Sequence, residues 1–140
     1  MANHSKLHNQ NYIGPGIWYK MHLDASWADT DDKKRCVIEQ IKHLQANFPC
    51  GECKEHFDNY IRTHPLELTL GKSPESLFVW TYNFHNAVNH RLKKAQVSYD
   101  DAKKIFYNNS EFCASDCGKE DKKVKTPPRL FPKDLPNYIL

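Results

Sequence analysis

The stretch "SPESLFVWTYNFHNAVNHRLKK", from Ser73 to Lys94, is the longest helix that the sequence predicts. Its first residues are typical of a helix start, because Ser73 can cap a helix and Pro74 suits the first helical position. At 3.6 residues per turn, two adjacent stripes form along this helix. Their members are Phe78, Tyr82, His85, Asn89 and Leu92 in the first stripe, and Leu77, Trp80, Phe84 and Val88 in the second, wholly apolar stripe. The stretch therefore predicts a helix that joins core residues to a row of polar side chains.

Four further helices are expected around this one, since helical periodicity recurs and no β-branched run alternates with polar residues. The first begins near Pro15, and the second follows the acidic run Asp29–Asp32, which offers an N-cap. The third runs from Cys50 to just before Pro65, and a short helix follows the cap Ser98. We therefore expect an all-α fold, a four-helix bundle with a short fifth helix.

Length and composition narrow the class of protein. The 140 residues are enough for one domain, which we place at 12–109 between a polar extension at 1–11 and a charged, proline-rich tail at 110–140. The net charge is +3 and basic residues alternate with acidic ones, so we expect no nucleic-acid partner. No apolar run approaches the roughly 20 residues of a membrane span, and the start lacks a secretory signal core. We therefore expect no membrane association and a cytoplasmic location.

The segment "FPCGECKEHF" contains two cysteines, Cys50 and Cys53, with two residues between them. A zinc site would need these cysteines with His56 and His64, but one helix cannot wrap all four around an ion. A structural disulfide across so short a loop would contribute little stability. The third interpretation is a redox-active dithiol at a helix N-terminus, where the helix dipole stabilises a thiolate. We favour the redox dithiol and expect no metal site.

The polar residues of the long helix suggest a cofactor, although a core helix with His85 and Asn89 hydrogen-bonded inside it is the simpler alternative. Asparagine is a poor choice for a helix interior on propensity alone. Trp18 and His22 supply an aromatic–imidazole pair on the first helix, and the long helix ends in two lysines. Such groups suit a flat, polar, phosphate-bearing cofactor. A glycine-rich dinucleotide fingerprint is absent, so a Rossmann mode of binding is not expected.

On these residues the chain resembles the Erv/ALR family of FAD-dependent sulfhydryl oxidases. The matching segments are "GPGIWYKMH" at 14–22, "FPCGECKEHF" at 48–57, "HP" at 64–65 and "HNAVNHRLKK" at 85–94. The resemblance implies a small helical bundle that binds FAD and forms a homodimer. It also implies an enzyme that oxidises thiols of partner proteins to disulfides, passing electrons from the CxxC dithiol to FAD and then to oxygen to give hydrogen peroxide.

The resemblance further implies roles for individual residues. Cys53 would be the cysteine next to the flavin, and Cys50 would exchange with incoming thiols through a mixed disulfide. The positions that match FAD contacts in the family are Gly14, Trp18, His22, Trp80, His85, Asn89 and Lys94. Cys113 and Cys117, in the tail, would suit a shuttle disulfide, with a local bridge or two reduced thiols as the alternative.

Several positions depart from the family pattern or lie outside it. Relatives carry a disulfide between positions that here hold Tyr82 and Tyr99, so we expect packing to replace the bridge. The residue after Gly14, often Arg in relatives, is Pro15, which puts one cofactor contact in question. The fifth cysteine, Cys36, is expected to be a small buried residue on the apolar face of the second helix.

Compact members encoded by large DNA viruses resemble this chain in the same departures. They imply a viral protein that acts in the cytoplasm, at virus assembly sites or in virions, with the mitochondrial intermembrane space as the alternative. Two other functions stay open: a non-catalytic zinc-binding helical module, and a flavin-binding interaction domain without turnover.

Overall fold

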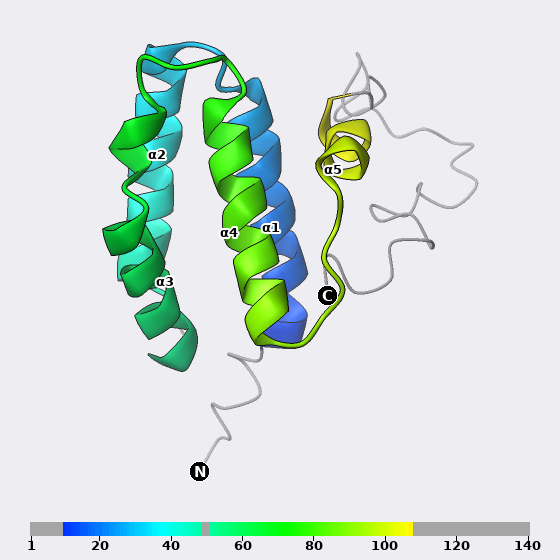
Figure 1. Cartoon of the computed structure of the whole chain (residues 1–140). Coiled ribbons are helices and arrows are strands. Elements are labelled where there is room, and N and C mark those ends of the chain that lie inside the picture. Colours follow the sequence, from blue (N-terminus) through cyan, green and yellow to red (C-terminus); the bar gives the residue numbers. More distant parts are fainter. Residues whose placement is uncertain (1–9, 49–50, 108–140) are drawn as a thin grey trace, which may run out of the picture.

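The computed structural model describes residues 10–48 and 51–107, which form five α-helices and one short 3-10 helix (Figure 1). In chain order the elements are α1 (Gln10–Trp27), α2 (Asp31–Ala46), α3 (Gly51–Thr63), the 3-10 helix η2 (Leu66–Thr69), α4 (Ser76–Arg91) and α5 (Tyr99–Phe106). No strand occurs in the described ranges, and the expected all-α class is confirmed. None of the helices in these ranges is both long and apolar enough to cross a lipid bilayer.

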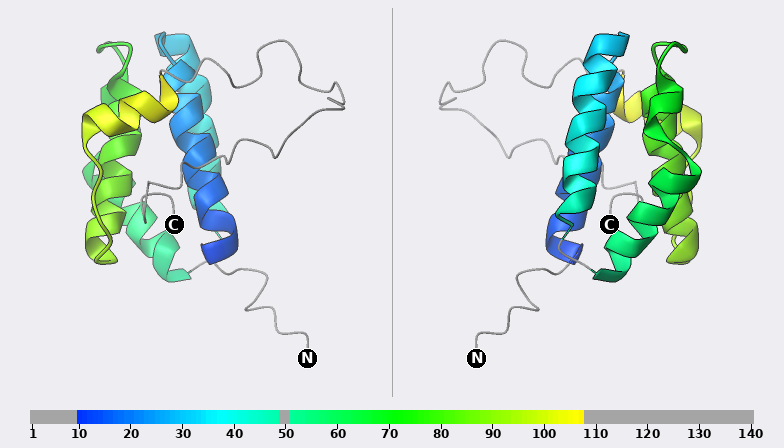
Figure 2. Two further views of the ribbon diagram at one scale, coloured as in Figure 1. Left: turned by 90° about the vertical axis from the view of Figure 1, so that its right-hand side faces the viewer. Right: turned by 90° about the vertical axis from the view of Figure 1, so that its left-hand side faces the viewer.

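The helices pack as two neighbouring pairs with α5 at one side. α1 and α4 lie side by side and run in opposite directions, while α2 contacts both α1 and α3 (Figures 1 and 2). α5 contacts α1 and lies on the side of the α1–α4 pair that faces away from α2 and α3 (Figure 1). Between the helices, Leu66, Leu77 and Phe78 are completely buried. These three side chains belong to one buried apolar cluster that the helices share.

Two helix starts follow the local sequence as expected. The Thr30 side chain accepts a hydrogen bond from the Lys33 amide at the start of α2. The carboxylates of Asp31 and Asp32 lie in the first turn, where they interact favourably with the positive end of the helix dipole. The Ser98 side chain accepts from the Asp101 amide in the same way and opens α5. The predicted cap at Ser98 is confirmed.

Two other starts differ from the prediction. α1 begins at Gln10, so Pro15 lies inside the helix, where its missing N–H removes one intrahelical hydrogen bond without ending the helix. α4 begins at Ser76, because Ser73 lies in a turn whose carbonyl accepts the Ser76 amide at 3.0 Å. A side chain from α2 also holds the Ser73 carbonyl, so a long-range contact overrides the local capping signal.

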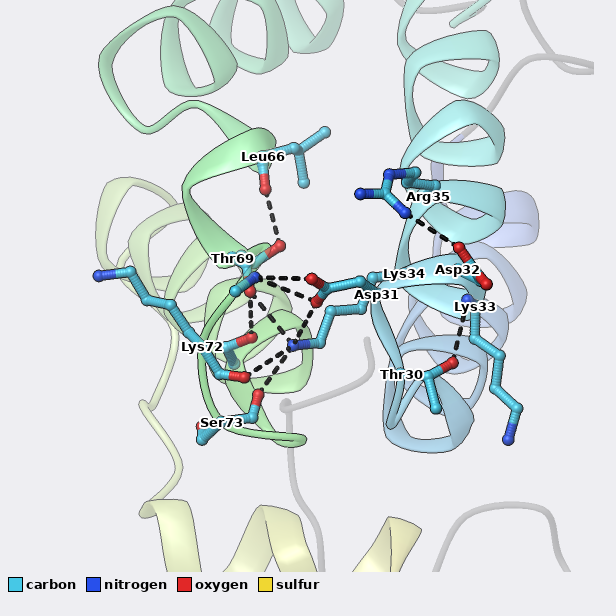
Figure 3. Close-up of polar contacts among 12 residues, drawn as sticks. Thr30, Asp31, Asp32, Lys33, Lys34, Arg35, Leu66, Thr69, Lys72 and Ser73 are labelled. Carbon is cyan, nitrogen blue, oxygen red and sulfur yellow. Dashed lines mark hydrogen bonds and ion pairs between the residues drawn. The ribbon is translucent and has the colours of Figure 1, made fainter.

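That side chain is Lys34, which is buried to 1% exposure and joins α2 to the segment before α4 (Figure 3). Its ammonium donates to three backbone carbonyls, those of Thr69 at 3.2 Å, Lys72 at 3.3 Å and Ser73 at 2.8 Å. The Asp31 carboxylate lies 3.8 Å from the ammonium and accepts the Gly71 amide at 3.0 Å. Burying a charge is costly unless it is paired and hydrogen-bonded, and here every partner is supplied. We call these contacts the Lys34 clamp.

Cys36 is exposed, so its predicted burial is wrong. The buried side chains of α2 are Lys34, Val37, Ile38 and Ile41. These positions follow the i, i+3, i+4, i+7 spacing of one helix face, and Cys36 points away from that face. The stem of Lys34, and not Cys36, lies on the buried face with these apolar side chains.

Tyr82 and Tyr99 pack against each other, with ring centroids 5.3 Å apart and ring planes at 64°. The Tyr82 hydroxyl donates to the Val97 carbonyl at 2.7 Å, and the Tyr99 hydroxyl donates to the Glu75 carboxylate at 2.7 Å. Edge-to-face aromatic pairs are favourable beyond the area they bury. The expectation that packing takes the place of the family's disulfide here is confirmed.

Candidate functional site

A cavity of about 90 Å³ lies where α1, α3 and the C-terminal half of α4 meet. Its lining residues are Gly14, Ile17, Trp18 and Met21 from α1, then Phe48, then Cys53, His56 and Phe57 from α3, and finally Phe84, His85, Val88, Asn89, Arg91, Leu92 and Lys94 from α4 and the residues after it. The wall is largely apolar with a few converging polar groups. This composition is typical of a cofactor site.

An aromatic stack forms one wall of the cavity. The Trp18 indole lies flat on the His85 imidazole, with ring centroids 3.9 Å apart and planes 1° from parallel. Phe84 contacts the same indole at 5.1 Å between centroids and stacks on Phe57 at 4.8 Å. The stack ties α1, α3 and α4 together at the cavity and presents flat apolar surface beside polar edges.

Behind this wall the two histidines are joined by a hydrogen bond. His22 Nε2 lies 2.8 Å from His85 Nδ1, and His22 Nδ1 lies 3.0 Å from the Thr81 hydroxyl. Burial lowers the pKa of His22 to about 3. Burial, followed by the charges of His22 and Lys94, holds the pKa of His85 well below its usual value. Both imidazoles are therefore neutral at physiological pH.

Two buried donors beside the cavity have no hydrogen-bond partner among the described residues: Asn89 Nδ2 and Arg91 Nε. An unsatisfied buried donor costs free energy, so such atoms indicate that an acceptor belongs nearby. A dinucleotide offers carbonyl, ring-nitrogen and phosphate acceptors, so this donor set fits one. The cavity volume of about 90 Å³ accommodates part of such a molecule, and the remainder would extend beyond it.

Lys94 reaches the cavity because α4 ends in a Schellman motif. The Lys94 amide donates to the Asn89 carbonyl at 2.8 Å, and the Lys93 amide donates to the His90 carbonyl at 3.1 Å. The motif requires a left-handed residue between helix and loop, and Lys93 takes that role with φ of 56°. The turn returns the chain toward the helix, which explains how a residue beyond its end joins the site.

Cys53 lies in the first turn of α3, is half-buried and lines the same cavity as the residues of α4. The backbone amides at a helix N-terminus favour a thiolate there. Cys50 lies outside the described residues, as do Cys113 and Cys117. His56 and Phe57 line the same cavity. No cluster of three metal-ligating side chains occurs in the described ranges.

Most of the predicted cofactor residues meet at this cavity. Five of them line it: Gly14, Trp18, His85, Asn89 and Lys94. His22 lies one layer behind, bonded to His85. Trp80 is not among the described lining residues; its indole donates to the His64 carbonyl at 2.8 Å and packs against Tyr60. Trp80 as a cofactor contact therefore stays a prediction.

Arg91 is a site residue that the sequence analysis did not select. It lies two positions after Asn89, and residues at that spacing do not share a helix face. In the structure the last turn of α4 borders the cavity, so side chains from several faces reach it. The guanidinium also lies 3.4 Å from the Glu52 carboxylate, which anchors it between α3 and α4. The basic character of this helix end was the available signal.

Comparisons with known proteins agree on one family. The model of the Erv1/Alr family matches residues 15–110. The FAD-linked sulfhydryl oxidase of African swine fever virus, isolate Warthog/Namibia, is 34% identical over 111 residues, which cover 77% of this chain and 90% of the viral protein. The FAD-linked sulfhydryl oxidase of Arabidopsis thaliana is 32% identical over 85 residues, which cover 59% of this chain and 43% of the plant protein.

Proposed function

Because the chain belongs to the Erv1/Alr family, we propose that it is an FAD-linked sulfhydryl oxidase that forms disulfide bonds in partner proteins. One observation carries the proposal: Cys53 lines the same cavity as the stacked Trp18–His85 pair and the unpartnered donors of Asn89 and Arg91. A thiol and a set of cofactor-binding groups thus face one space. That is the arrangement that electron transfer from a dithiol to a flavin requires.

Different residues around the cavity would bind different parts of FAD. Trp18 and Phe84 offer flat surfaces for a ring system, while Asn89 Nδ2 donates to a carbonyl or ring nitrogen. Arg91 and Lys94 supply positive charge for phosphate. When bound, FAD would take up two electrons from the dithiol and pass them to oxygen, so that two thiols and one oxygen molecule give one disulfide and hydrogen peroxide.

The two cysteines of the CxxC have separate tasks in this proposal. A substrate thiolate would attack Cys50 of the oxidised Cys50–Cys53 pair, so that a mixed disulfide forms at Cys50 and Cys53 leaves as a thiolate. The second substrate thiol then resolves the mixed disulfide, which leaves the substrate oxidised and the pair reduced. Cys53, in the first turn of α3, lines the cavity, and the positive end of the helix dipole would favour its thiolate when the pair is reduced. Cys113 and Cys117 would relay electrons from substrate to this pair. A Cys113→Ser/Cys117→Ser variant should then oxidise dithiothreitol normally and protein thiols more slowly.

Visible spectroscopy of the purified chain, followed by an oxidase assay, tests the proposal. We expect a yellow protein that releases about one FAD per chain and produces peroxide from dithiothreitol. Cys53→Ser should retain FAD and lose turnover, while Cys36→Ser, at an exposed position on α2, should keep both. A colourless protein that carries zinc would support the zinc module instead. Bound FAD without peroxide would support an interaction domain without turnover.

We also infer a homodimer. Apolar side chains line a groove between α1 and α2, on a different side of the fold from α5; they are Ile17, Met21, Val37, Ile41 and Leu44. Light scattering should give twice the chain mass of 16.4 kDa. A viral origin belongs to the same proposal, and the match to the African swine fever virus protein supports it. A cytoplasmic site of action stays a prediction.

A further inference from the structure

The chain between α4 and α5, residues 92–98, is fastened to α4 at both of its ends. We call it the return segment, because it turns back after α4 and leads to α5 (Figures 1 and 2). At its start the Lys94 amide donates to the Asn89 carbonyl at 2.8 Å. Near its end the Asn86 side chain, from the middle of α4, holds the backbone of Val97.

Asn86 pairs with both backbone groups of Val97. Its Oδ1 accepts the Val97 amide at 3.2 Å, and its Nδ2 donates to the Val97 carbonyl at 3.0 Å. Because the side-chain oxygen can only accept and the nitrogen can only donate, the two contacts together fix the orientation of the amide. The Tyr82 hydroxyl donates to the same carbonyl at 2.7 Å, and the Val97 side chain packs against the core. Asparagine is unfavourable inside a helix, and this anchor offsets that cost at Asn86.

The return segment carries Lys94 to the cavity. Lys94 lies three residues before Val97 and lines the cavity, where its charge helps to lower the pKa of His85. The residue before it, Lys93, has φ of 56°, and a conformation of this kind persists only where the surrounding structure holds it. Asn86 itself is not among the described residues that line the cavity. Its effect on a ligand must therefore pass through the return segment.

We propose that Asn86 is a positioning residue for the cofactor, which fixes Val97 and thereby keeps Lys94 in place to bind a phosphate group. A side chain whose backbone is already held at both ends loses less freedom when a ligand binds, so the ligand is bound more tightly. The role in binding FAD rests on the function proposed above. The anchor between Asn86 and Val97 does not.

Hydrogen exchange of the Val97 amide tests the anchor directly. We expect this amide to be protected in the full-length chain, with and without FAD, because the Asn86 side chain accepts its hydrogen. Asn86→Ala should remove the protection. Asn83→Ala, at an exposed position one turn earlier on α4, should leave it unchanged.

Affinity for FAD tests whether the anchor acts through Lys94. Asn86→Ala should bind FAD about fivefold more weakly, and Lys94→Met about tenfold more weakly. In the Lys94→Met chain the additional Asn86→Ala change should have little further effect, because the group that the anchor positions is gone. A merely structural role would weaken binding equally in both backgrounds. Asn83→Ala should bind FAD as the unaltered chain does.

Equal effects of Asn86→Ala with and without Lys94 would overturn the proposal. A Val97 amide that exchanges without protection in the unaltered chain, or unchanged FAD affinity in Lys94→Met, would overturn it even if Asn86→Ala did not fold. Absence of FAD binding in the unaltered chain would refute the proposed function and with it this role of Asn86. A protected Val97 amide would in that case still establish the anchor.

Discussion

At the scale of single residues, Lys34 shows how one buried charge can organise a connection between helices. Its ammonium donates to three backbone carbonyls of the segment between the start of η2 and α4 (Figure 3). Aliphatic carbons of its stem fill a core position on α2. The same side chain therefore supplies both packing and hydrogen bonding.

Replacing Lys34 by methionine should keep the packing and remove the donors. We expect the free energy of unfolding to fall by about 2 to 4 kcal/mol, because three backbone carbonyls lose the ammonium as a donor and Asp31 loses its counter-charge. Urea denaturation monitored by circular dichroism would measure this change. Lys33→Met, which removes an exposed ion pair with Asp29, should cost less than about 0.5 kcal/mol. Equal effects of the two substitutions would contradict the role of the clamp.

At the scale of the elements, the C-terminal end of α4 includes an unfavourable backbone conformation. Lys93 adopts φ of 56°, a left-handed conformation that glycine takes without strain and other residues take at a cost. The Schellman turn holds it there, and the same turn brings Lys94 to the cavity. A site residue is thus placed by a strained neighbour.

Lys93→Gly should relieve that strain. We expect the free energy of unfolding to rise by about 0.5 to 1 kcal/mol, with unchanged FAD binding because Lys94 keeps its place. Lys93→Ala, which keeps the Cβ atom, should change stability by less than about 0.5 kcal/mol. Thermal or urea unfolding of the three chains would decide. A destabilised glycine variant would show that the Lys93 side chain contributes more than its backbone costs.

The contact between Tyr82 and Tyr99 joins α4 to α5 and should show energetic coupling. A double-mutant cycle with Tyr82→Leu and Tyr99→Leu should give a coupling energy of about 0.5 to 1.5 kcal/mol. Tyr99→Phe keeps the ring and loses only the hydrogen bond to Glu75, so it separates ring packing from hydrogen bonding. If the effects of the two leucine substitutions on the free energy of unfolding were strictly additive, the ring contact would not couple α4 to α5.

Local sequence predicted the elements well where the cause is local. The side chains of Thr30 and Ser98 cap their helices, and each accepts a hydrogen bond from the backbone amide three residues later. The start of α4 escaped prediction because the Ser73 carbonyl is held by Lys34, 39 positions earlier in the chain, and such a contact has no local signature. Cys36 was misplaced because the buried face of α2 includes Lys34 with Val37 and Ile41, and a lysine gives no sign in the sequence that it belongs to the core.

The site was predictable as far as it follows helix periodicity. His85 and Asn89 are four residues apart on one face of α4, as are Trp18 and His22 on α1, and all four belong to the cavity wall or the layer behind it. Arg91 escaped because the helix ends there and periodicity no longer selects one face. The contacts of His22 with Thr81 and His85 escaped too, since they depend on atoms brought together from two helices.

At the scale of the whole molecule, two buried neutral histidines make stability depend on pH. Unfolded, each ring has a pKa of about 6.5; folded, burial lowers the pKa of His22 to about 3 and that of His85 in the same direction. The unfolded chain therefore binds more protons below pH 6.5, and stability is lost as the pH falls. The hydrogen bond from Lys54 lowers the pKa of the Asp58 carboxyl. Protonation of such carboxyl groups therefore reduces stability only at a lower pH than protonation of the histidines.

Between pH 7 and pH 5 we expect the free energy of unfolding to decline, approaching a slope of about 1.4 kcal/mol per pH unit for each histidine. Urea denaturation across this range in the full chain would measure the slope. His22→Asn should roughly halve it, since one of the two titrating rings is gone. A slope near zero in the unaltered chain would mean that these rings are protonated inside the fold.

The tyrosine joint between α4 and α5 has a chemical consequence of its own. A covalent bridge at this place would be open to attack by the very thiolates that a disulfide-forming enzyme encounters, and shuffling would then loosen the scaffold during turnover. Two aromatic rings have no bond that a reductant can cleave. The contact between α4 and α5 at these two tyrosines therefore does not depend on the redox potential of the surroundings. We expect it to persist in a reducing compartment as well as in an oxidising one.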